Sequence, residues 1–220
     1  MTHAPRKLLS RSQRHAAILQ GAATAFATKG FASTAMEEVA AASGITKEIV
    51  YRHFASKEEL YRAVLEGAAQ RTREEFARAR HEYESGAGIR ALLAVGRAQP
   101  DALRLLLVHA AREPEFADYA HDVRSRVINW VLQRRGHDDP LFHRWAAEVA
   151  VSHVRNALLT WLDVGDPARD EEFARRCLAG VNALWKAWNA PLKGGVVRRS
   201  EVVMEGRREG LPDRVARRQV

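Results

Sequence analysis

The sequence predicts an all-α protein, and three observations support this prediction. Apolar residues recur at intervals of three and four along most of the chain, which is the spacing of one helix face. No stretch shows the sustained two-residue alternation that a half-buried strand requires. Breaks that contain Gly or Pro separate the helical segments, and two of them are Asp-Pro pairs, which are typical helix starts. A chain of 220 residues can bury a sizeable core in one or two domains.

The first 60 residues carry the most specific pattern. A helix is expected over residues 12–28, and Gly30 is placed to end it. Two shorter helices follow, of which one stops at Ser43-Gly44 and the other covers residues 46–54. Gly44 suits the turn between them because glycine adopts a positive φ without a steric penalty. Two short helices joined by a tight, glycine-containing turn are typical of the helix-turn-helix motif.

The second short helix is expected to have one buried and one exposed face. Val50 should be buried with Val39 and Ile45 between the two helices. With His53 at the border, the opposite face would then present Lys47, Glu48, Tyr51 and Arg52. A protruding short helix with cationic, phenolic and imidazole side chains suits the major groove of DNA.

Two Ser/Thr-x-x-Glu sequences predict helix starts on either side of the motif. In Thr34–Glu37 and in Ser56–Glu59, the hydroxyl and the carboxylate can satisfy free backbone amides reciprocally. Capping alone accounts for the residues of both sequences.

Residues 12–65, about a quarter of the chain, resemble the DNA-binding domain of tetracycline-repressor-like (TetR family) transcription regulators. The resemblance rests on motifs in a fixed order: Ile18-Leu19, Ala22, Phe26, Gly30-Phe31, Thr34, Val39-Ala40, Gly44-Ile45-Thr46-Lys47, Val50-Tyr51, His53-Phe54 and Ser56-Lys57-Glu58-Glu59-Leu60. One departure is Glu48-Ile49, which stands where the family often carries small residues such as Gly and Thr. The base preference of the family is therefore not carried over.

The resemblance implies a homodimeric transcriptional regulator, usually a repressor, that inserts residues 46–54 of each protomer into the major groove of a palindromic operator. Lys47 is the candidate for a base-edge contact, because lysine donates well to guanine O6 and N7. Glu48 either reads a cytosine amine or favours the helix N-terminus, and both roles stay open. Arg52 belongs to the same DNA-binding set, and the side chains expected on phosphates are Thr34, Thr46, Tyr51, His53 and Lys57.

The net charge of +8 is unevenly distributed along the chain. Residues 1–60 carry 8 Lys and Arg against 5 acidic residues, residues 61–190 carry 19 against 18, and residues 191–220 carry 8 against 4. Basic ends around a nearly neutral middle favour nucleic acid as a partner of the ends.

Three parts of the chain are expected. Residues 1–56 form an N-terminal arm and the helix-turn-helix DNA-binding domain, and residues 57–190 form a helical ligand-binding and dimerisation domain. Residues 191–220 read as a mostly disordered basic tail, whose contact with DNA is left open. The helices of the second domain are expected over residues 57–83, 89–98, 100–112, 116–135, 140–164 and 168–189.

The last two helices carry long apolar stripes. These stripes form either the core of the domain itself or, as the resemblance implies, a four-helix bundle with a second copy of the chain. The expected interface residues are Val149, Ala157, Trp161, Val181, Trp185 and Trp188.

A mainly apolar effector site is expected inside the second domain. The run Leu103–His109 is apolar on more than one face, so its helix should be buried, and isolated polar groups interrupt it. Apolar walls with a few convergent polar groups are usual for small-molecule pockets. The alternative is a solid core in which such groups only satisfy backbone atoms. The candidate lining residues are Leu106, His109, Phe116, Trp130, His153 and Asn156.

The sequence contains no motif that would indicate an enzyme. Phosphate-binding loops, a GxSxG elbow and Glu-x-x-His pairs are all missing, so no catalytic residue, metal or cofactor is assigned. Cys177 is the single cysteine, which fits a reducing cytoplasm, and no signal sequence or apolar run of membrane-spanning length occurs. We therefore expect a cytoplasmic protein with no membrane partner.

The alternative function is an architectural or ligand-independent DNA-binding protein. Such proteins need little beyond charge and an apolar wedge. About two thirds of this chain is instead expected to form a near-neutral helical domain with its own core, which favours a sensor of a small molecule.

Overall fold

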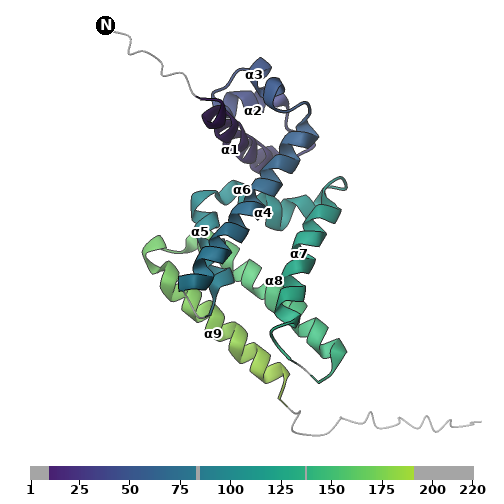
Figure 1. The fold of residues 1–220 in the computed structure, drawn as a ribbon, viewed down its shortest axis with the longest axis vertical. Coiled ribbons are helices and arrows are strands. Elements are labelled where there is room, and N and C mark those ends of the chain that lie inside the picture. The colour runs from purple at the N-terminus through teal and green to yellow at the C-terminus, as the bar shows by residue number, and fades with distance from the viewer. Residues whose placement is uncertain (1–9, 83–84, 137, 191–220) are drawn as a thin grey trace, which may run out of the picture. The chain divides into compact units, whose positions relative to one another are not determined.

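The computed structural model describes residues 10–82, 85–136 and 138–190, and these residues form helices and no strands (Figure 1). The all-α prediction is confirmed. The elements are α1 (Arg11–Lys29), α2 (Met36–Ser43), α3 (Lys47–His53), α4 (Lys57–Glu82), α5 (Ala87–Ala98), α6 (Pro100–Arg104), the π-helical turn η1 (Leu105–His109), the 3₁₀ turn η2 (Ala110–Arg112), α7 (Ala117–Leu132), α8 (Pro140–Val164), the 3₁₀ turn η3 (Pro167–Arg169) and α9 (Asp170–Trp188).

The described residues up to Asn189 form one compact unit. Residues 1–9 of the expected N-terminal arm and the disordered basic tail expected over residues 191–220 lie outside the described residues. No helix in the described ranges is long and apolar enough to cross a membrane.

α1 is closed at both ends by local hydrogen bonds. The Ser10 hydroxyl accepts the Gln13 amide at 3.1 Å, and the Gln13 side chain accepts the Ser10 amide at 2.8 Å, which makes a capping box. Gly30 ends the helix with a φ of 82°, as its position in the sequence predicts. The buried face consists of Ile18, Gly21, Ala22, Ala23 and Phe26.

α2 and α3 form the predicted helix-turn-helix. Gly44 lies between them in the left-handed region, with a φ of 64°. α1 crosses α2 so closely that a Cβ atom on Gly21 would lie 2.5 Å from the backbone nitrogen of Ser43. The sequence pattern does not reveal this crossing, because it depends on how two helices meet.

The capping box predicted at Thr34 is wrong. The Thr34 side chain is 2% exposed, and its hydroxyl donates to the Gly30 carbonyl at 2.7 Å. Ala35 is the residue that precedes α2, and the Glu38 carboxylate accepts its amide at 3.0 Å. A threonine hydroxyl can serve nearby carbonyls as well as amides, and here it serves the carbonyls at the end of α1.

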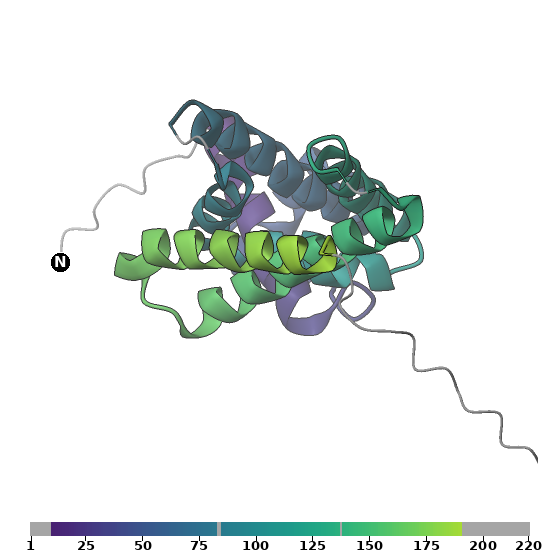
Figure 2. The same cartoon turned by 90° about the horizontal axis from the view of Figure 1, so that it is seen from below.

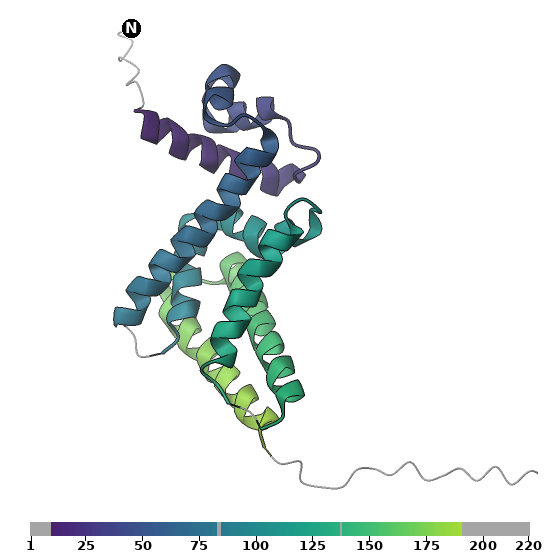
Figure 3. The ribbon, with the colours of Figure 1, turned by 45° about the vertical axis from the view of Figure 1, so that its right-hand side comes forward.

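α4 begins close to the predicted pattern. The Ser56 hydroxyl accepts the Glu59 amide at 3.1 Å, whereas the Glu59 carboxylate accepts the amide of Ala55 at 2.7 Å. The buried series of the helix starts with Leu60 and Val64, as expected. Figure 3 shows α4 leading away from α3 towards α5.

One apolar core joins the first three helices to the helices that follow. Phe26 and Phe31 each lie 5.0 Å from the ring of Tyr61 on α4, measured between ring centroids. Tyr61 lies 4.5 Å from Phe116, which directly precedes α7. The core therefore continues across the domain boundary expected between residues 56 and 57, and that division stays a prediction. Its members from α6 to α7 are Ala102, Leu105, Leu106, Ala110, Phe116 and Ala120.

The helix expected over residues 100–112 is not one regular α-helix. α6 passes into the π-helical turn η1, and the 3₁₀ turn η2 follows. A π-helical turn has i→i+5 hydrogen bonds in place of i→i+4. Leucine-rich spacing is compatible with both, so the sequence does not distinguish them.

α8 and α9 pack side by side in antiparallel directions (Figures 2 and 3). The first half of α8 meets the end of α9 in a cluster that includes Ala146 and Trp185. The second half of α8 meets the start of α9 in a cluster that includes Leu158 and Cys177.

A polar cluster fixes the start of α9. The Asp170 carboxylate accepts hydrogen bonds from the Arg97 guanidinium at 2.8 Å and from the Trp161 Nε1 at 2.6 Å. Arg97 lies on α5 and Trp161 on α8, so one carboxylate connects three helices. The pKa of Asp170 is lowered, first by the Arg97 hydrogen bond, against an opposing effect of burial.

Candidate nucleic-acid interface

α3 presents the side chains predicted to contact DNA. Val50 on its inner face is fully buried, whereas Tyr51 on its outer face is 45% exposed. His53 is half-buried, and the remaining exposed members of the predicted set are Thr46, Lys47, Glu48 and Arg52. Figure 1 shows α3 beside α2, at the N-terminal end of α4. The outer face of α3 is therefore open to a macromolecule.

Lys47 is held by its neighbours on two helices. Its Nζ forms an ion pair with the Glu37 carboxylate at the start of α2 and lies 5.7 Å from the centroid of the Tyr51 ring. The hydrogen bond with Glu37 raises the pKa of Lys47, and the same bond lowers the pKa of the Glu37 carboxyl. Lys47 is thus a charged donor whose position α2 helps to fix.

Glu48 uses its carboxylate within the first turn of α3. The pKa of Glu48 is lowered by a hydrogen bond from its own backbone amide and next by one from the Thr46 side chain. Of the two roles left open by the sequence, this contact favours the interaction with the helix N-terminus in the free protein.

Lys57 and Thr34 are turned away from the outer face. The Lys57 Nζ donates to the carbonyls of Phe31 at 2.9 Å and Ala32 at 3.2 Å, and it lies 4.6 Å from the centroid of the Phe31 ring. The ammonium therefore ties α4 to the loop after α1. Because Thr34 is buried and bonded inside the fold, its position argues against the expected phosphate contact.

Two neighbours of α3 are absent from the predicted set. Glu37 pairs with Lys47, and the ring of His15 lies 5.9 Å from that of His53. Glu37 belongs to α2 and His15 to α1. Periodicity within one helix carries no signal for contacts between helices, so the sequence could not single them out.

The residues expected to line an effector pocket differ in how deeply they are buried. Leu106 and Phe116 are buried in the core that contains Tyr61, and His109 is half-buried. Trp130 is 38% exposed and packs edge-on against Phe76 at 5.5 Å. His153 and Asn156 lie on the exposed side of α8.

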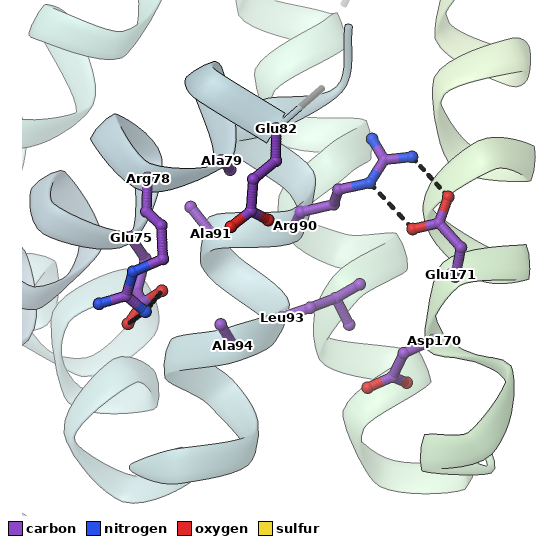
Figure 4. A pocket seen from close by; sticks show the side chains of 10 residues that line it. All are labelled: Glu75, Arg78, Ala79, Glu82, Arg90, Ala91, Leu93, Ala94, Asp170 and Glu171. Carbon is purple, nitrogen blue, oxygen red and sulfur yellow. Dashed lines mark hydrogen bonds and ion pairs between the residues drawn. The ribbon is translucent and has the colours of Figure 1, made fainter. Parts of the chain in front are cut away.

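A cleft of about 320 Å³ lies instead between α4, α5 and the start of α9 (Figure 4). Six of its ten lining residues are charged. Arg90 forms two hydrogen bonds with Glu171, at 2.6 and 2.9 Å, and Arg78 pairs with Glu75 at 2.8 Å. None of the six predicted lining residues borders this cleft. Across the described ranges, no group of three or more His, Cys, Asp or Glu residues could hold a metal ion.

The expected interface residues on α8 and α9 divide into two groups. Val181 and Trp185 are buried against α8 of the same chain, and Trp161 is stacked on Phe173 at 5.0 Å. Ala157 packs in the same cluster as Trp161. Val149, Ala157, Trp161 and Trp188 are all half-exposed, so only Val181 and Trp185 are buried within the chain.

Exposed apolar side chains lie near the start of α8, and one of them contacts the half-exposed Trp188 of α9. Leu141 and Trp145 near the start of α8 are 74% and 44% exposed. The ring centroids of Trp145 and Trp188 lie 4.9 Å apart. We call Leu141, Trp145 and Phe142, which is 52% exposed, the α8 patch.

The segment that contains the helix-turn-helix is similar to known proteins. Residues 18–64 match the model of the bacterial regulatory proteins of the tetR family. The HTH-type transcriptional activator FasR of Mycolicibacterium smegmatis is 40% identical over 58 residues, which is 26% of either chain. The matched segment thus spans about a quarter of this curated relative, which is named as a transcriptional activator.

Solved structures share the fold over most of the chain. A TetR-like transcriptional regulator from Rhodococcus sp. RHA1 has a TM-score of 0.62 and 20% identity, over 82% of this chain and 98% of the other. A crystal structure of AibR in complex with isovaleryl coenzyme A and operator DNA has a TM-score of 0.55 and 22% identity, over 78% of this chain and 98% of the other. The helical fold of this chain is therefore similar to the fold of these two structures.

Proposed function

We propose that this chain, whose residues 18–64 form a DNA-binding domain of the tetR family, is an effector-responsive transcriptional repressor that binds a palindromic operator as a homodimer. In this proposal it acts in the cytoplasm on double-stranded DNA. A small, mainly apolar molecule releases it by favouring a conformation that does not bind the operator. The effector must bind that conformation more tightly than the DNA-bound one, because equal affinity would shift nothing.

The outer face of α3 is the observation that carries the proposal. Within a domain matched to a family of regulators, this face exposes one restrained cation, a phenol and a guanidinium. We assign Lys47 to a base edge in the major groove. Backbone phosphates are assigned to Thr46, Tyr51, Arg52 and His53.

Selection from a random DNA pool tests this function. The wild-type protein should enrich duplexes that contain two inverted half-sites, because a two-fold symmetric dimer reads the same sequence twice. The architectural alternative predicts enrichment without a consensus and similar affinity for selected and random duplexes. Pools that converge on no sequence would therefore contradict the repressor and favour that alternative.

The α8 patch supports the dimeric part of the proposal. Contiguous exposed apolar side chains mark interaction surfaces in soluble proteins, and the patch adjoins the half-exposed Trp188. Sedimentation at micromolar concentration should give a dimer for the wild type and a monomer for Trp145→Glu. Val127→Glu, at a site of 46% exposure on α7, is the matched control and should stay dimeric. A stable wild-type monomer would rule out the dimer.

Tyr61 supports the effector part of the proposal. Its side chain is fully buried, and its hydroxyl has no hydrogen-bond partner in the part of the chain that the structure describes. Burial raises the pKa of Tyr61 to about 12, so the hydroxyl is a neutral donor at ordinary pH. An unpaired buried donor is costly, and an effector with one acceptor atom would satisfy it. Leu106 and Phe116 of the same core would supply apolar contacts.

A thermal-shift screen of apolar metabolites, followed by operator binding, tests the effector site. Hits should raise the melting temperature and weaken operator binding. Tyr61→Phe should reduce the response to hits that carry an acceptor while leaving operator affinity without ligand unchanged. Hits that stabilise the protein but never alter operator affinity would contradict the sensor mechanism.

A further inference from the structure

A cationic cluster lies where the start of α1 meets the end of α3. The His15 ring is stacked on the Phe54 ring at 5.2 Å, with 28° between the planes, and lies 5.9 Å from the His53 ring. Stacking on Phe54, which is 4% exposed, holds His15 beside His53. Two imidazoles from different helices are therefore paired at the edge of the face that we assign to DNA.

Basic side chains surround His53 in this part of the fold. Its pKa is lowered, first by desolvation and then by the charges of His15, Arg11, Arg14 and Arg52. These groups come from α1 and from α3 itself. In the free protein the His53 ring is therefore held mainly in its neutral form near pH 7.

Carboxylates on the neighbouring helices have other partners. Glu37 and Glu38 of α2 form ion pairs with Lys47 and Lys29. On α4, the Glu59 carboxylate accepts the amide of Ala55. Neither imidazole takes part in these two ion pairs. The cluster concentrates positive charge at a place where an external anion would stabilise it.

We propose that His15 and His53 together bind one phosphate of the DNA backbone, and that this binding takes up a proton. The inference rests on the proposed DNA-binding function and adds a contact from α1, outside the helix-turn-helix. A protonated imidazole donates from both ring nitrogens, whereas the neutral form donates from one. A phosphate supplies the opposite charge that favours the protonated ring.

The direction of the pH dependence follows from His53. Its pKa is lowered in the free protein and rises beside a phosphate, because the anion stabilises the charged ring. Between the free and the bound pKa, binding takes up a proton, so affinity rises as the pH falls. The dissociation constant changes by up to about tenfold per pH unit for one proton. At pH values outside this window, His53 contributes no pH dependence to the affinity for DNA.

Fluorescence anisotropy tests the proposal, with a labelled duplex that the wild-type protein has enriched from a random pool. Titrations at fixed salt from about pH 5.5 to about pH 8.5 span the range in which histidines titrate. The wild-type dissociation constant should increase with pH. His15→Gln and His53→Gln should flatten this slope and keep the selected sequence. His15→Arg should keep tight binding at high pH, because its charge does not titrate.

A histidine far from α3 provides the matched control for the pH dependence. His153→Gln removes an exposed histidine on α8 and should keep the wild-type slope. An equal slope in the wild type and in His15→Gln would overturn the proposal, and His15 is exposed enough for its variant to fold. A wild type without preference for any duplex would contradict the proposed function itself.

Discussion

The first three helices and the α8–α9 pair bury their apolar residues to different extents. Val39 of α2 and Val50 of α3 are fully shielded, whereas Leu141 and Trp145 of α8 are 74% and 44% exposed. Short helices are only marginally stable in isolation. The apolar faces of α2 and α3 therefore need to be covered by other parts of the same chain. Long helices such as α8 can leave part of an apolar stripe for a partner. The outer face of α3 is therefore free for polar recognition, while the α8 patch is suited to a second protein surface.

The largest loss of stability is expected from a substitution in the core that α1 to α3 share with the later helices. Phe116 is 1% exposed and lies in the core that holds Phe26 and Val50. Phe116→Ala should lower the free energy of unfolding by about 3–5 kcal/mol. The five Trp residues all follow residue 129, so their fluorescence reports on α7 to α9, whereas operator binding reports on α3. Both signals should be lost at the same urea concentration; two separate transitions would show that the regions fold independently.

The α1–α2 crossing predicts the next effect. Gly21→Ala would place a Cβ atom 2.5 Å from the Ser43 backbone and should cost about 1–3 kcal/mol of stability. Gly67→Ala on α4 is the control, because its added Cβ meets nothing within 4 Å. The control should stabilise the protein by about 0.5–1 kcal/mol, since glycine is unfavourable inside a helix. Equal melting temperatures for the two variants would disprove the tight crossing.

A substitution at Thr34 distinguishes a structural role of its hydroxyl from a contact with DNA. Thr34→Val removes the hydroxyl that donates to the Gly30 carbonyl and should lower the free energy of unfolding by about 1–2 kcal/mol. Operator affinity of the folded protein should not change, because Thr34 is buried. Weaker operator binding without a loss of stability would restore the phosphate contact that the sequence suggests.

The smallest loss of stability is expected from a substitution of Asp170, whose carboxylate fixes the start of α9. The hydrogen bond from Arg97 lowers the pKa of Asp170 below its ordinary value of 3.8. A lowered pKa contributes stability that is present above the unfolded pKa and is lost as the pH falls through the folded pKa. Asp170→Asn should cost about 0.5–1.5 kcal/mol at neutral pH and less below about pH 4. Urea unfolding at both pH values measures this, and a cost that is the same at both would contradict it.

Much of the structure of α1 to α3 can be predicted, because the sequence signals that specify it are local. Gly44 needs its positive φ at the turn, and the burial of Val50 follows from its spacing. The start of α8 is equally local, since the Asp139 side chain accepts the Leu141 amide at 2.8 Å just before the helix. Each of these features depends on residues within one or two turns of the chain.

The parts that could not be predicted depend on contacts between helices. Periodicity shows which residues share a helix face but not what covers that face. The sequence therefore assigns His153 and Asn156 to a pocket, whereas both lie on the exposed side of α8. The ion pair between Glu37 and Lys47 is likewise set by the crossing of two helices.

Binding-site selection with Lys47→Ala most directly tests whether the outer face of α3 reads DNA sequence. The wild type, Lys47→Ala and Lys186→Ala would be given the same random pool, since Lys186 is an exposed lysine on α9. Lys47→Ala should lose discrimination at one position of each half-site by about ten- to a hundredfold. Lys186→Ala should return the wild-type consensus. If Lys47→Ala also returned the wild-type consensus at unchanged strength, Lys47 would not read a base.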